Sequence, residues 1–469
     1  MYEHIALFII KLFKQRVFFM IEKNEFYEVE FVDMTHDGMG VCKIEGYPVF
    51  VSNALKGEKA KIRIIKVNKS FGFARLVEIQ SESPFRKEPI CDHFYECGGC
   101  NLMHMNYQMQ LDFKKYRTKE TLRKLGKIEA TVHETVGMIN PYYYRNKSVI
   151  PFGEVNGKMV SGLFKNRTHE IIDMKKCYII PKITTDIVKY LKNIFMELNI
   201  PAYNENLRTG VIRHVIVRNS YKYDDISVTI VTFTSKLPKK EIIIKKLAAR
   251  FKRIVSIVQN YNPDNTNIVF GRKSRILFGE DFIKDEINGV KFKISHRSFY
   301  QVNPIQTEEL YKKAIEYADL SSDEVIIDAY CGIGTIGLSV APYAKTVLGV
   351  DIVKQSIDDA NSNANYNGIK NTKFVTGKAE SVIKSWKNYD VDVLFIDPPR
   401  KGCDKEFLKT IAEMKIPKIV YISCNVSTLA RDLNFLQAHN YDVVEVTPYD
   451  MFPQTSHIET VTKLRLSKY

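Results

Sequence analysis

Apolar and polar residues alternate in short runs over residues 26–79, and Gly, Asn and Asp interrupt these runs. Period-two alternation over about five residues is typical of half-buried strands. The pattern predicts a small all-β barrel over residues 21–80. Barrels of this size commonly bind nucleic acid, although a basic strand face that only meets solvent is the alternative. The cations in its second half are Lys56, Lys59, Lys61, Arg63, Lys66, Lys69 and Arg75.

Two further patterns follow along the chain. Residues 81–105 are rich in Pro, Gly and Cys, and a basic helix is predicted over 111–126. Residues 130–300 then have a mixed, mostly β pattern with basic and aromatic clusters such as PYYYRNKS and GVIRHVIVR. We therefore predict a central, β-rich α+β domain over residues 81–300.

From Ser321 onward, short apolar runs such as EVIIDAY, TVLGVD, VDVLFIDPP and KIVYISC alternate with helix-like stretches. Alternating strands and helices are typical of a doubly wound parallel sheet. The pattern predicts an α/β, Rossmann-like C-terminal domain over residues 301–469. Three domains suit a chain of 469 residues.

The charge is unevenly distributed among these regions. Residues 1–300 hold 50 Lys and Arg against 32 Asp and Glu, whereas residues 301–469 hold 19 against 22. The front of the chain thus carries +18 and the rest −3, which together give the net charge of +15. The asymmetry favours an anionic macromolecule as the partner of the first two domains. A generally lysine-rich proteome is the alternative explanation.

The N-terminus has neither the pattern of a secretory signal nor an apolar run long enough to span a membrane. Residues 1–20 are apolar and basic, as in a membrane-surface helix, but we favour an upstream extension, with Met20 opening the native protein. We expect a cytoplasmic protein with reduced thiols, no membrane association and no obligate protein partner.

Three cysteines are clustered as Cys91-x5-Cys97-x2-Cys100, and Gly98 and Gly99 permit a tight turn between the last two. A tetrahedral zinc ion or a cubane iron–sulfur cluster needs a fourth ligand, for which Cys177 is the candidate. The spacing does not decide between a zinc ion and an iron–sulfur cluster. It differs from the C-x3-C-x2-C loop of radical S-adenosylmethionine enzymes, which argues against radical chemistry.

A glycine turn follows the first strand of the C-terminal domain. Gly332, Gly334 and Gly337 have the spacing G-x-G-x-x-G, and Asp351 ends the next predicted strand, where it can accept from ribose hydroxyls. Nicotinamide dinucleotides and S-adenosylmethionine both use this arrangement, so the glycines do not decide between the two cofactors.

Two later strands end in reactive groups. One runs into Asp397-Pro398-Pro399 and the next into Ser423-Cys424-Asn425. Ligands bind at the carboxyl ends of strands in open α/β sheets, so we expect the acid and the thiol on the same edge as the glycine turn. A dehydrogenase has no use for this thiol, whereas an enzyme that activates a poor carbon nucleophile does.

The blocks IDPPRKG, YISCNVSTLARD, DMFPQTSHIET and SFYQVN resemble the signature blocks of the TrmA/RumA-type RNA uracil-5-methyltransferases. The resemblance extends from about residue 24 to the C-terminus, in family order, and the barrel is similar to a TRAM domain. Two positions depart from the family. Val426 stands where proline is usual, and Thr335 stands where a larger polar residue is common.

This resemblance implies specific roles. Cys424 is the expected nucleophile and Glu459 the expected base, and Asp397 is expected to hold the uracil or the amino end of the cofactor. A [4Fe–4S] cluster on the four cysteines is favoured, with a structural or RNA-contacting role. The residues expected to bind S-adenosylmethionine are Gln301, Tyr330, Thr335, Asp351 and Asp397.

The resemblance also implies RNA as the partner. Relatives that act on transfer RNA generally lack both the barrel and the cluster, so 23S rRNA is the expected substrate. The alternatives are a transfer RNA enzyme, a non-catalytic RNA-binding or ribosome-assembly protein, and a nicotinamide-dependent oxidoreductase. The expected RNA contacts in the central domain are Arg145, Lys147, Arg213, His214 and Arg218.

Overall fold

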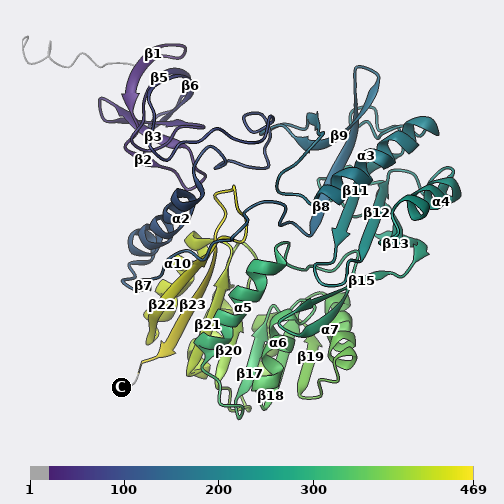
Figure 1. Ribbon diagram of the computed structural model, residues 1–469. Helices are drawn as coiled ribbons and strands as arrows, with labels where there is room; N and C mark the ends of the chain where they lie inside the picture. The colour runs from purple at the N-terminus through teal and green to yellow at the C-terminus, as the bar shows by residue number, and fades with distance from the viewer. Residues whose placement is uncertain (1–20, 468–469) are drawn as a thin grey trace, which may run out of the picture. The chain divides into compact units, whose positions relative to one another are not determined.

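The computed structural model describes residues 21–467, which fold into two compact units (Figure 1). The first unit holds residues 21–88 and 101–106, and the second holds residues 89–100 and 107–467. Among the residues that the structure describes, no helix combines the length and apolar character that a membrane crossing requires.

The first unit is one six-stranded sheet in the order β1-β5-β6-β4-β3-β2. Its inward-facing residues, among them Cys42, Val49 and Ile62, are fully buried, and the residues between them are more exposed. The predicted all-β domain is confirmed. Its strands are β1 (Phe26–Glu30), β2 (Asp33–Met34), β3 (Gly40–Ile44), β4 (Tyr47–Val51), β5 (Lys59–Val67) and β6 (Gly72–Ser81).

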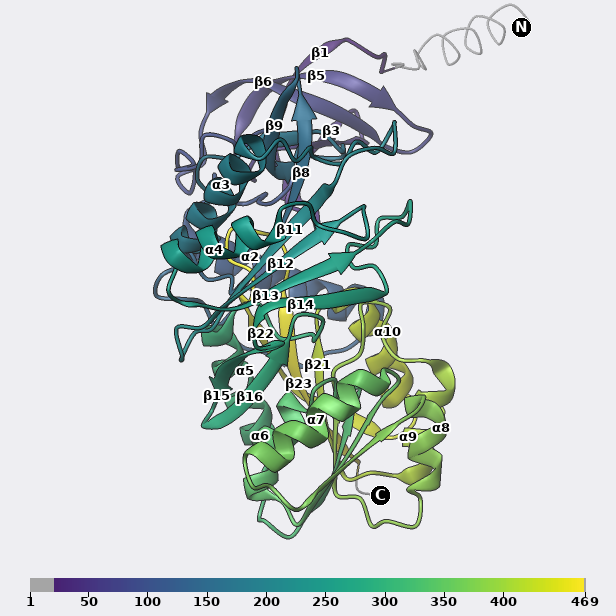
Figure 2. The same ribbon diagram turned by 90° about the vertical axis from the view of Figure 1, so that its right-hand side faces the viewer.

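A seven-stranded mixed sheet, in the order β10-β9-β8-β11-β12-β13-β14, forms the first part of the second unit. Two helices, α3 (Lys182–Glu197) and α4 (Lys240–Arg250), pack their apolar residues against one face of it (Figure 2). The strands are β8 (Lys147–Val155), β9 (Lys158–Phe164), β10 (Ile171–Asp173), β11 (Ile212–Asn219), β12 (Ile226–Thr232), β13 (Ile254–Tyr261) and β14 (Lys273–Gly279), followed by the hairpin of β15 (Phe282–Ile287) and β16 (Val290–Ser295).

The C-terminal part is an eight-stranded sheet in the order β19-β18-β17-β20-β21-β23-β22-β7. The strands from β19 to β21 are parallel, and β23 returns antiparallel to β21. The strands are β17 (Val325–Ala329), β18 (Thr346–Asp351), β19 (Thr372–Thr376), β20 (Val393–Ile396), β21 (Lys418–Ser423), β22 (Tyr441–Tyr449), β23 (Glu459–Leu466) and β7 (Thr131–Val132).

Helices cover both faces of this sheet, as a doubly wound fold requires. Neighbouring strand residues such as Ile326 and Ile327 therefore enter different cores. The first core includes residues of α5 (Pro304–Ala318), α6 (Thr335–Val340) and α7 (Lys354–Tyr366), and the 3-10 turn η2 (Ala341–Tyr343) follows α6. The second core includes residues of α8 (Ala379–Ser385), α9 (Lys405–Met414) and α10 (Val426–Gln437).

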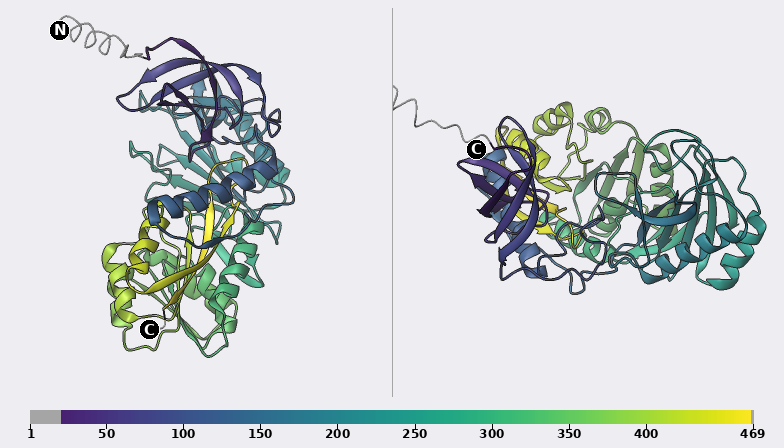
Figure 3. Two further views of the ribbon diagram at one scale, coloured as in Figure 1. Left: turned by 90° about the vertical axis from the view of Figure 1, so that its left-hand side faces the viewer. Right: turned by 90° about the horizontal axis from the view of Figure 1, so that it is seen from above.

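The predicted basic helix is present as α2 (Tyr107–Thr121), which continues into the π-helical turn η1 (Leu122–Gly126). It contacts helix α10 and the edge strands β22 and β7 of the C-terminal sheet, and in the left view of Figure 3 it crosses the yellow C-terminal strands. Strand β7 pairs with the edge of the same sheet. Residues 107–132 thus pack on the C-terminal sheet, although their place in the sequence assigns them to the central domain.

Candidate active site

Four parallel strands of the C-terminal sheet end at one edge, and a candidate functional residue stands at each end. Tyr330 follows β17, Asp351 ends β18, Asp397 follows β20 and Cys424 follows β21. Ligands bind at this edge in open α/β sheets. The structure therefore brings together the residues that the strand pattern predicted to meet.

The turn after β17 has a backbone that leaves room for a ligand. Gly332 has φ +55° and a Cβ placed on it would meet no atom within 4 Å, so the turn is open on that side. The Asp351 carboxylate accepts hydrogen bonds from the backbone N–H groups of Gly332 (3.1 Å) and Val353 (2.8 Å). Asp351 thus fixes the turn as well as offering a carboxylate beside it.

The third glycine of the turn has a structural role. Gly337 donates its N–H to the Oδ2 atom of the fully buried Asp328 (2.7 Å), and a Cβ there would lie 2.8 Å from that oxygen. Burial raises the pKa of Asp328 to about 8. Because Asp328 accepts this N–H, the glycine spacing here is not evidence for a pyrophosphate. Sequence reasoning missed Asp328, which reads as an ordinary strand residue.

The other predicted cofactor contacts lie around the same turn. The hydroxyls of Thr335 and Tyr311 are hydrogen-bonded to each other (2.8 Å), so this tyrosine of α5 occupies part of the space that a larger residue at 335 would fill. Tyr330, at φ +63°, packs edge-to-face on Phe407. Gln301 is buried, and its carbonyl accepts from the side chain of Asn146 (2.9 Å).

Cys424 and Glu459 are brought together by the pairing of β21 with β23. Ser423 pairs with Thr460, so one step further along the antiparallel register places Cys424 opposite Glu459. Glu459 is 4% exposed, and Cys424 is half-buried. Cys424 and Glu459 are 35 positions apart in the sequence, and the pairing of β21 with β23 brings them close together.

The electrostatics of this group are unusual. Burial, together with the Glu459 and Asp397 carboxylates, raises the pKa of the Cys424 thiol to about 11, against the opposing effect of Arg400. Burial and Asp397 raise the pKa of Glu459 well above its usual range, and burial raises that of Asp397 to about 7. Three acidic groups thus share one site, which disfavours their ionisation together.

Such a site suits a cationic ligand. The sulfonium and ammonium charges of S-adenosylmethionine would offset the carboxylates, and the open glycine turn leaves space beside Asp351. The residues present therefore fit this cofactor. A nicotinamide dinucleotide carries a pyrophosphate, whose negative charge would add to that of the acids.

The loop after Asp397 is attached to the start of α10. Asn425 caps this helix by accepting from the N–H of Ser427 (3.0 Å), and its side-chain amide donates to the carbonyl of Arg400 (3.1 Å). Val426 is the first residue of α10 and is buried. Proline is favoured at this first helical position, so valine and proline are both compatible with the start of α10.

The four clustered cysteines also meet in space. The pKa of Cys100 is raised well above its usual range by burial and by the charges of Cys177, Cys97 and Cys91. Gly99 donates its N–H to the Cys97 sulfur (3.3 Å), and the loop is tied to β9 by a hydrogen bond from Gly98 to Phe164 (3.1 Å). Within residues 21–467, no three His, Cys, Asp or Glu side chains are grouped closely enough to hold a single metal ion.

Two of the expected RNA contacts are wrong. Arg218 is 3% exposed and donates to the carbonyl of Ser298 (2.7 Å), and Arg213 is buried and donates to the carbonyls of Asn262 (2.9 Å) and Asp264 (2.7 Å). These guanidinium groups fasten loops to the central sheet, so they are not available to phosphates.

The remaining three expected contacts differ among themselves. Burial lowers the pKa of His214 to about 4, so its ring is uncharged at neutral pH and cannot attract phosphates by charge. Arg145 is half-buried. Lys147 lies over the ring of Phe270, and burial lowers its pKa to about 8. Arg145 and Lys147 stay predicted RNA contacts.

One concentration of exposed positive charge in the central part lies around α4. Residues 239–253 hold seven cations and one acid, Glu241. Between α3 and the end of α4 is a hollow of about 520 Å³, lined in part by Lys189, Tyr190, Arg250 and Phe251, whose two aromatic rings meet edge-to-face. The seven cations are Lys239, Lys240, Lys245, Lys246, Arg250, Lys252 and Arg253.

A Rossmann-like sheet with an open glycine turn, an acid at the end of its second strand and a thiol near two acids at the same edge is typical of S-adenosylmethionine-dependent methyltransferases. The chain belongs to the tRNA (Uracil-5-)-methyltransferase family, whose sequence model matches residues 106–467. It is thus a member of a family of RNA uracil-5-methyltransferases. The TRAM domain model matches residues 22–77, the six-stranded first unit.

Similar proteins extend over nearly the whole chain. A Bacillus cereus protein described as an uncharacterized RNA methyltransferase is 47% identical over 449 residues, which cover 95% of this chain and 98% of that protein. A Listeria monocytogenes protein of the same description is 47% identical over 450 residues, covering 96% and 99%. Among solved structures, the Pyrococcus abyssi tRNA (uracil-54, C5)-methyltransferase in complex with S-adenosyl-L-homocysteine has a TM-score of 0.76 at 26% identity, covering 93% of this chain and 99% of that one.

Proposed function

We propose that this enzyme transfers a methyl group from S-adenosylmethionine to C5 of a uracil in 23S rRNA, which gives 5-methyluridine. The observation that carries the proposal is that Cys424, Glu459 and Asp397 lie near enough for their charges to interact, at the edge of the sheet where the glycine turn lies. The chemistry of uracil requires a thiol and a base in one pocket with a methyl donor.

Uracil C5 is too weak a nucleophile to take a methyl group unaided. The Cys424 sulfur adds to C6, which turns the ring into an enolate with carbanion character at C5. When bound, the cofactor would supply an electrophilic methyl group, to which C5 forms a bond as the sulfur–methyl bond breaks and S-adenosylhomocysteine leaves. Glu459 then removes the proton from C5, the C5=C6 double bond returns and the bond between C6 and the Cys424 sulfur breaks.

The raised pKa of Cys424 fits this scheme once the ligands are considered. In the free protein the thiol holds its proton, because burial and the two neighbouring acids raise its pKa. A cation bound beside Asp397 favours ionisation of all three acids. We propose that Gln301, Tyr330, Thr335, Asp351 and Asp397 hold the cofactor, so that the thiolate forms only in the loaded enzyme.

Two kinds of RNA compete as the substrate. The cysteine group and the TRAM domain support 23S rRNA, since relatives acting on transfer RNA generally lack both. The similarity to the Pyrococcus abyssi transfer RNA enzyme extends over 93% of this chain, which favours transfer RNA as the second candidate.

Nucleoside mass spectrometry distinguishes these substrates. The protein is incubated with S-adenosylmethionine and, separately, with unmodified 23S rRNA and unmodified transfer RNA. We expect 5-methyluridine in the ribosomal RNA alone. Methylation of transfer RNA alone would keep the chemistry and overturn the substrate, and product in neither RNA would overturn the proposal.

We further propose that Cys91, Cys97, Cys100 and Cys177 hold a [4Fe–4S] cluster. The thiols are near enough for their charges to interact, and four cysteine thiolates are the usual ligands of such a cluster. The N–H group on the Cys97 sulfur is a contact that stabilises such ligands. Anaerobically purified protein should contain iron and sulfide; zinc without iron would refute the cluster.

The RNA is proposed to meet two basic surfaces, one on each unit. On the first unit, the half-exposed ring of Phe26 has Lys61 and Arg63 over it (5.5 and 5.8 Å), which is a platform for base stacking beside phosphates. On the second unit, the α4 cations and the hollow beside Tyr190 and Phe251 offer the same combination.

A further inference from the structure

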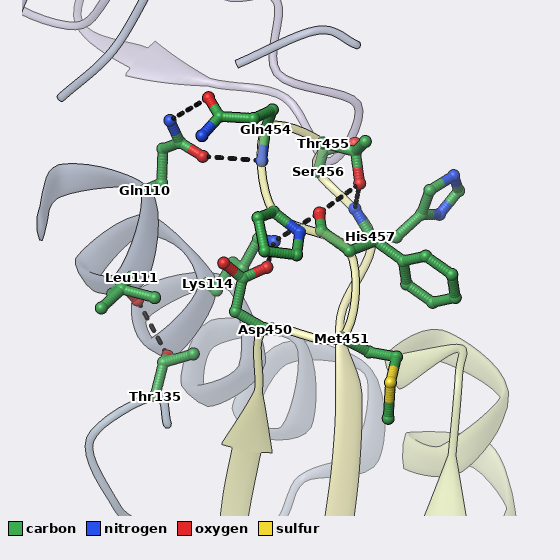
Figure 4. A network of polar contacts seen from close by, with 12 residues as sticks. Gln110, Leu111, Lys114, Thr135, Asp450, Met451, Gln454, Thr455, Ser456 and His457 are labelled. Atoms are coloured by element: carbon green, nitrogen blue, oxygen red, sulfur yellow. Dashed lines mark hydrogen bonds and ion pairs between the residues drawn. The ribbon is translucent and has the colours of Figure 1, made fainter. Parts of the chain in front are cut away.

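One face of α2 is polar but buried against the C-terminal part. Tyr107, Gln110, Lys114 and Arg117 follow one another at intervals of three, four and three residues, which places their side chains on one side of the helix. All four make hydrogen bonds to the loop of residues 450–458 that joins β22 to β23 (Figure 4 shows Gln110 and Lys114).

We propose that α2 is a positioning element for the catalytic base and that Lys114 is its main positioning residue. This inference rests on the proposed function. The loop that α2 holds ends at Ile458, and Glu459 is the next residue. Glu459 can reach the C5 proton only if this loop keeps its shape, and the contacts of the loop with α2 contribute to that shape.

The centre of the contact is an ion pair without exposure to water. The Lys114 ammonium contacts the Asp450 carboxylate, and both side chains are 0% exposed. The Tyr107 hydroxyl donates to the second oxygen of Asp450 (2.7 Å), and Lys114 also donates to the carbonyl of Phe452 (3.4 Å). Asp450 directly follows Tyr449, which pairs with Glu459, so the ion pair lies at the base of the loop.

Two further contacts hold the tip of the loop. The side chain of Gln110 both donates to and accepts from Gln454, through its amide nitrogen to the Gln454 side chain (3.1 Å) and through its oxygen from the Gln454 N–H (3.1 Å). Gln454 has φ +69°, a backbone conformation that needs such support in a residue other than glycine. Arg117 donates to the carbonyl of Ser456 (2.6 Å).

A buried ion pair is a poor choice for stability alone. Removing two charges from water costs several kcal/mol, and apolar residues of similar volume are often as stable or more so. A pair with several hydrogen bonds does, however, allow few alternative arrangements. The polar stripe of α2 therefore serves the geometry of the loop, and this geometry decides where the Glu459 carboxylate stands.

The reaction scheme provides a specific test. Glu459 acts only in the last step, so an enzyme with a misplaced base still forms the Cys424–C6 bond and methylates C5 but releases product slowly. With radiolabelled S-adenosylmethionine and RNA, K114M should accumulate a methyl-labelled protein–RNA adduct that resists denaturing gels. We expect kcat to fall about 10- to 100-fold, with KM for RNA unchanged within about twofold.

Controls separate positioning from folding. K115M removes the neighbouring lysine, which forms an exposed ion pair with Glu134, and should behave like the parent enzyme. K114R should recover part of the turnover. If K114M fails to fold, Q110A tests the same loop without leaving a buried charge unpaired, and it should also accumulate adduct.

The positive control is E459Q, which should accumulate the adduct if Glu459 is the base. If E459Q forms no adduct, the proposed function fails. If E459Q accumulates adduct but folded K114M and Q110A turn over without it, the proposed function stands and the positioning role of α2 is refuted.

Discussion

The central sheet and the C-terminal sheet both bury charged residues, but they treat them differently. In the central sheet, the guanidinium groups of Arg213 and Arg218 donate to backbone carbonyls of neighbouring loops. At the edge of the C-terminal sheet, Asp397 and Glu459 instead lie near each other and near the Cys424 thiol, and all three have raised pKa values. Buried charges that complete hydrogen bonds maintain structure, whereas like-charged groups kept together mark the site of chemistry.

The largest expected effect is at the thiol. C424A removes the atom that adds to C6, so methylation should fall by at least about 10,000-fold, because the uracil ring is then not activated. The protein should stay folded, since Cys424 is only half-buried. Radiolabelled methyl transfer measures the change, and the matched variant C42A, at a cysteine of the first unit, should retain activity. Full activity of C424A would show that the group of acids at the edge of the C-terminal sheet is not the site of chemistry.

The next effect concerns the base. E459Q keeps the size of the side chain but cannot take the C5 proton, and we expect turnover to fall about 100- to 10,000-fold. Substrate binding should be unchanged, which RNA titration by fluorescence anisotropy measures. An E459Q variant with normal turnover would remove Glu459 from the mechanism.

Removal of the buried guanidinium group of Arg218 should lower the stability of the fold. R218M leaves the carbonyl of Ser298 without its donor, so the free energy of unfolding should fall by about 2–3 kcal/mol. Denaturant unfolding measures this loss. The kcat of the folded enzyme should change little; a selective loss of kcat with unchanged stability would make Arg218 part of the site and would contradict the contrast between the two sheets.

Removal of the Asp397 carboxyl at the reactive edge should instead raise the free energy of unfolding. The folded protein holds the Asp397 proton up to a pKa of about 7, whereas the unfolded chain loses it near its ordinary value. Stability therefore falls as the pH rises from about 4 to about 7. D397N lacks this loss and should be more stable by about 4 kcal/mol above pH 7, with the difference vanishing near pH 4. Unfolding curves across this range measure it; a difference that is constant with pH would contradict the raised pKa.

The smallest effect is expected on the surface. The double variant K245E/R250E reverses two exposed charges around α4 and should weaken RNA binding about 10-fold, with a shallower dependence on salt. The control is K354E on α7, a lysine that is highly exposed and pairs with Asp358. Equal effects of the two variants on affinity would mean that the α4 surface does not contact RNA.

The sequence allowed the edge of the C-terminal sheet to be predicted because strand ends are visible as apolar runs that stop. Asp351, Asp397 and Cys424 each follow such a run, and parallel strands bring their ends together. Glu459 came only from the family resemblance, since its partner depends on the antiparallel register of β23, which the sequence does not reveal.

Other parts could not be predicted for physical reasons. A basic residue in a strand has the same pattern whether it faces solvent or a carbonyl, so Arg213 and Arg218 were mistaken for RNA contacts. The buried stripe of α2 reads as the solvent face of a basic helix, because Gln110, Lys114 and Arg117 are residues that usually lie outside. Their partners are more than 300 positions away in the sequence.

The most direct test of the account uses RNA in which uridine is replaced by 5-fluorouridine. Fluorine at C5 leaves no proton for Glu459 to remove, so the reaction should stop at a methylated adduct. Digestion and mass spectrometry should then find the methylated 5-fluorouridine attached to the peptide that contains Cys424. An adduct on another cysteine, or methyl transfer to the RNA without any adduct, would contradict the assignment of Cys424 and Glu459 as the catalytic pair.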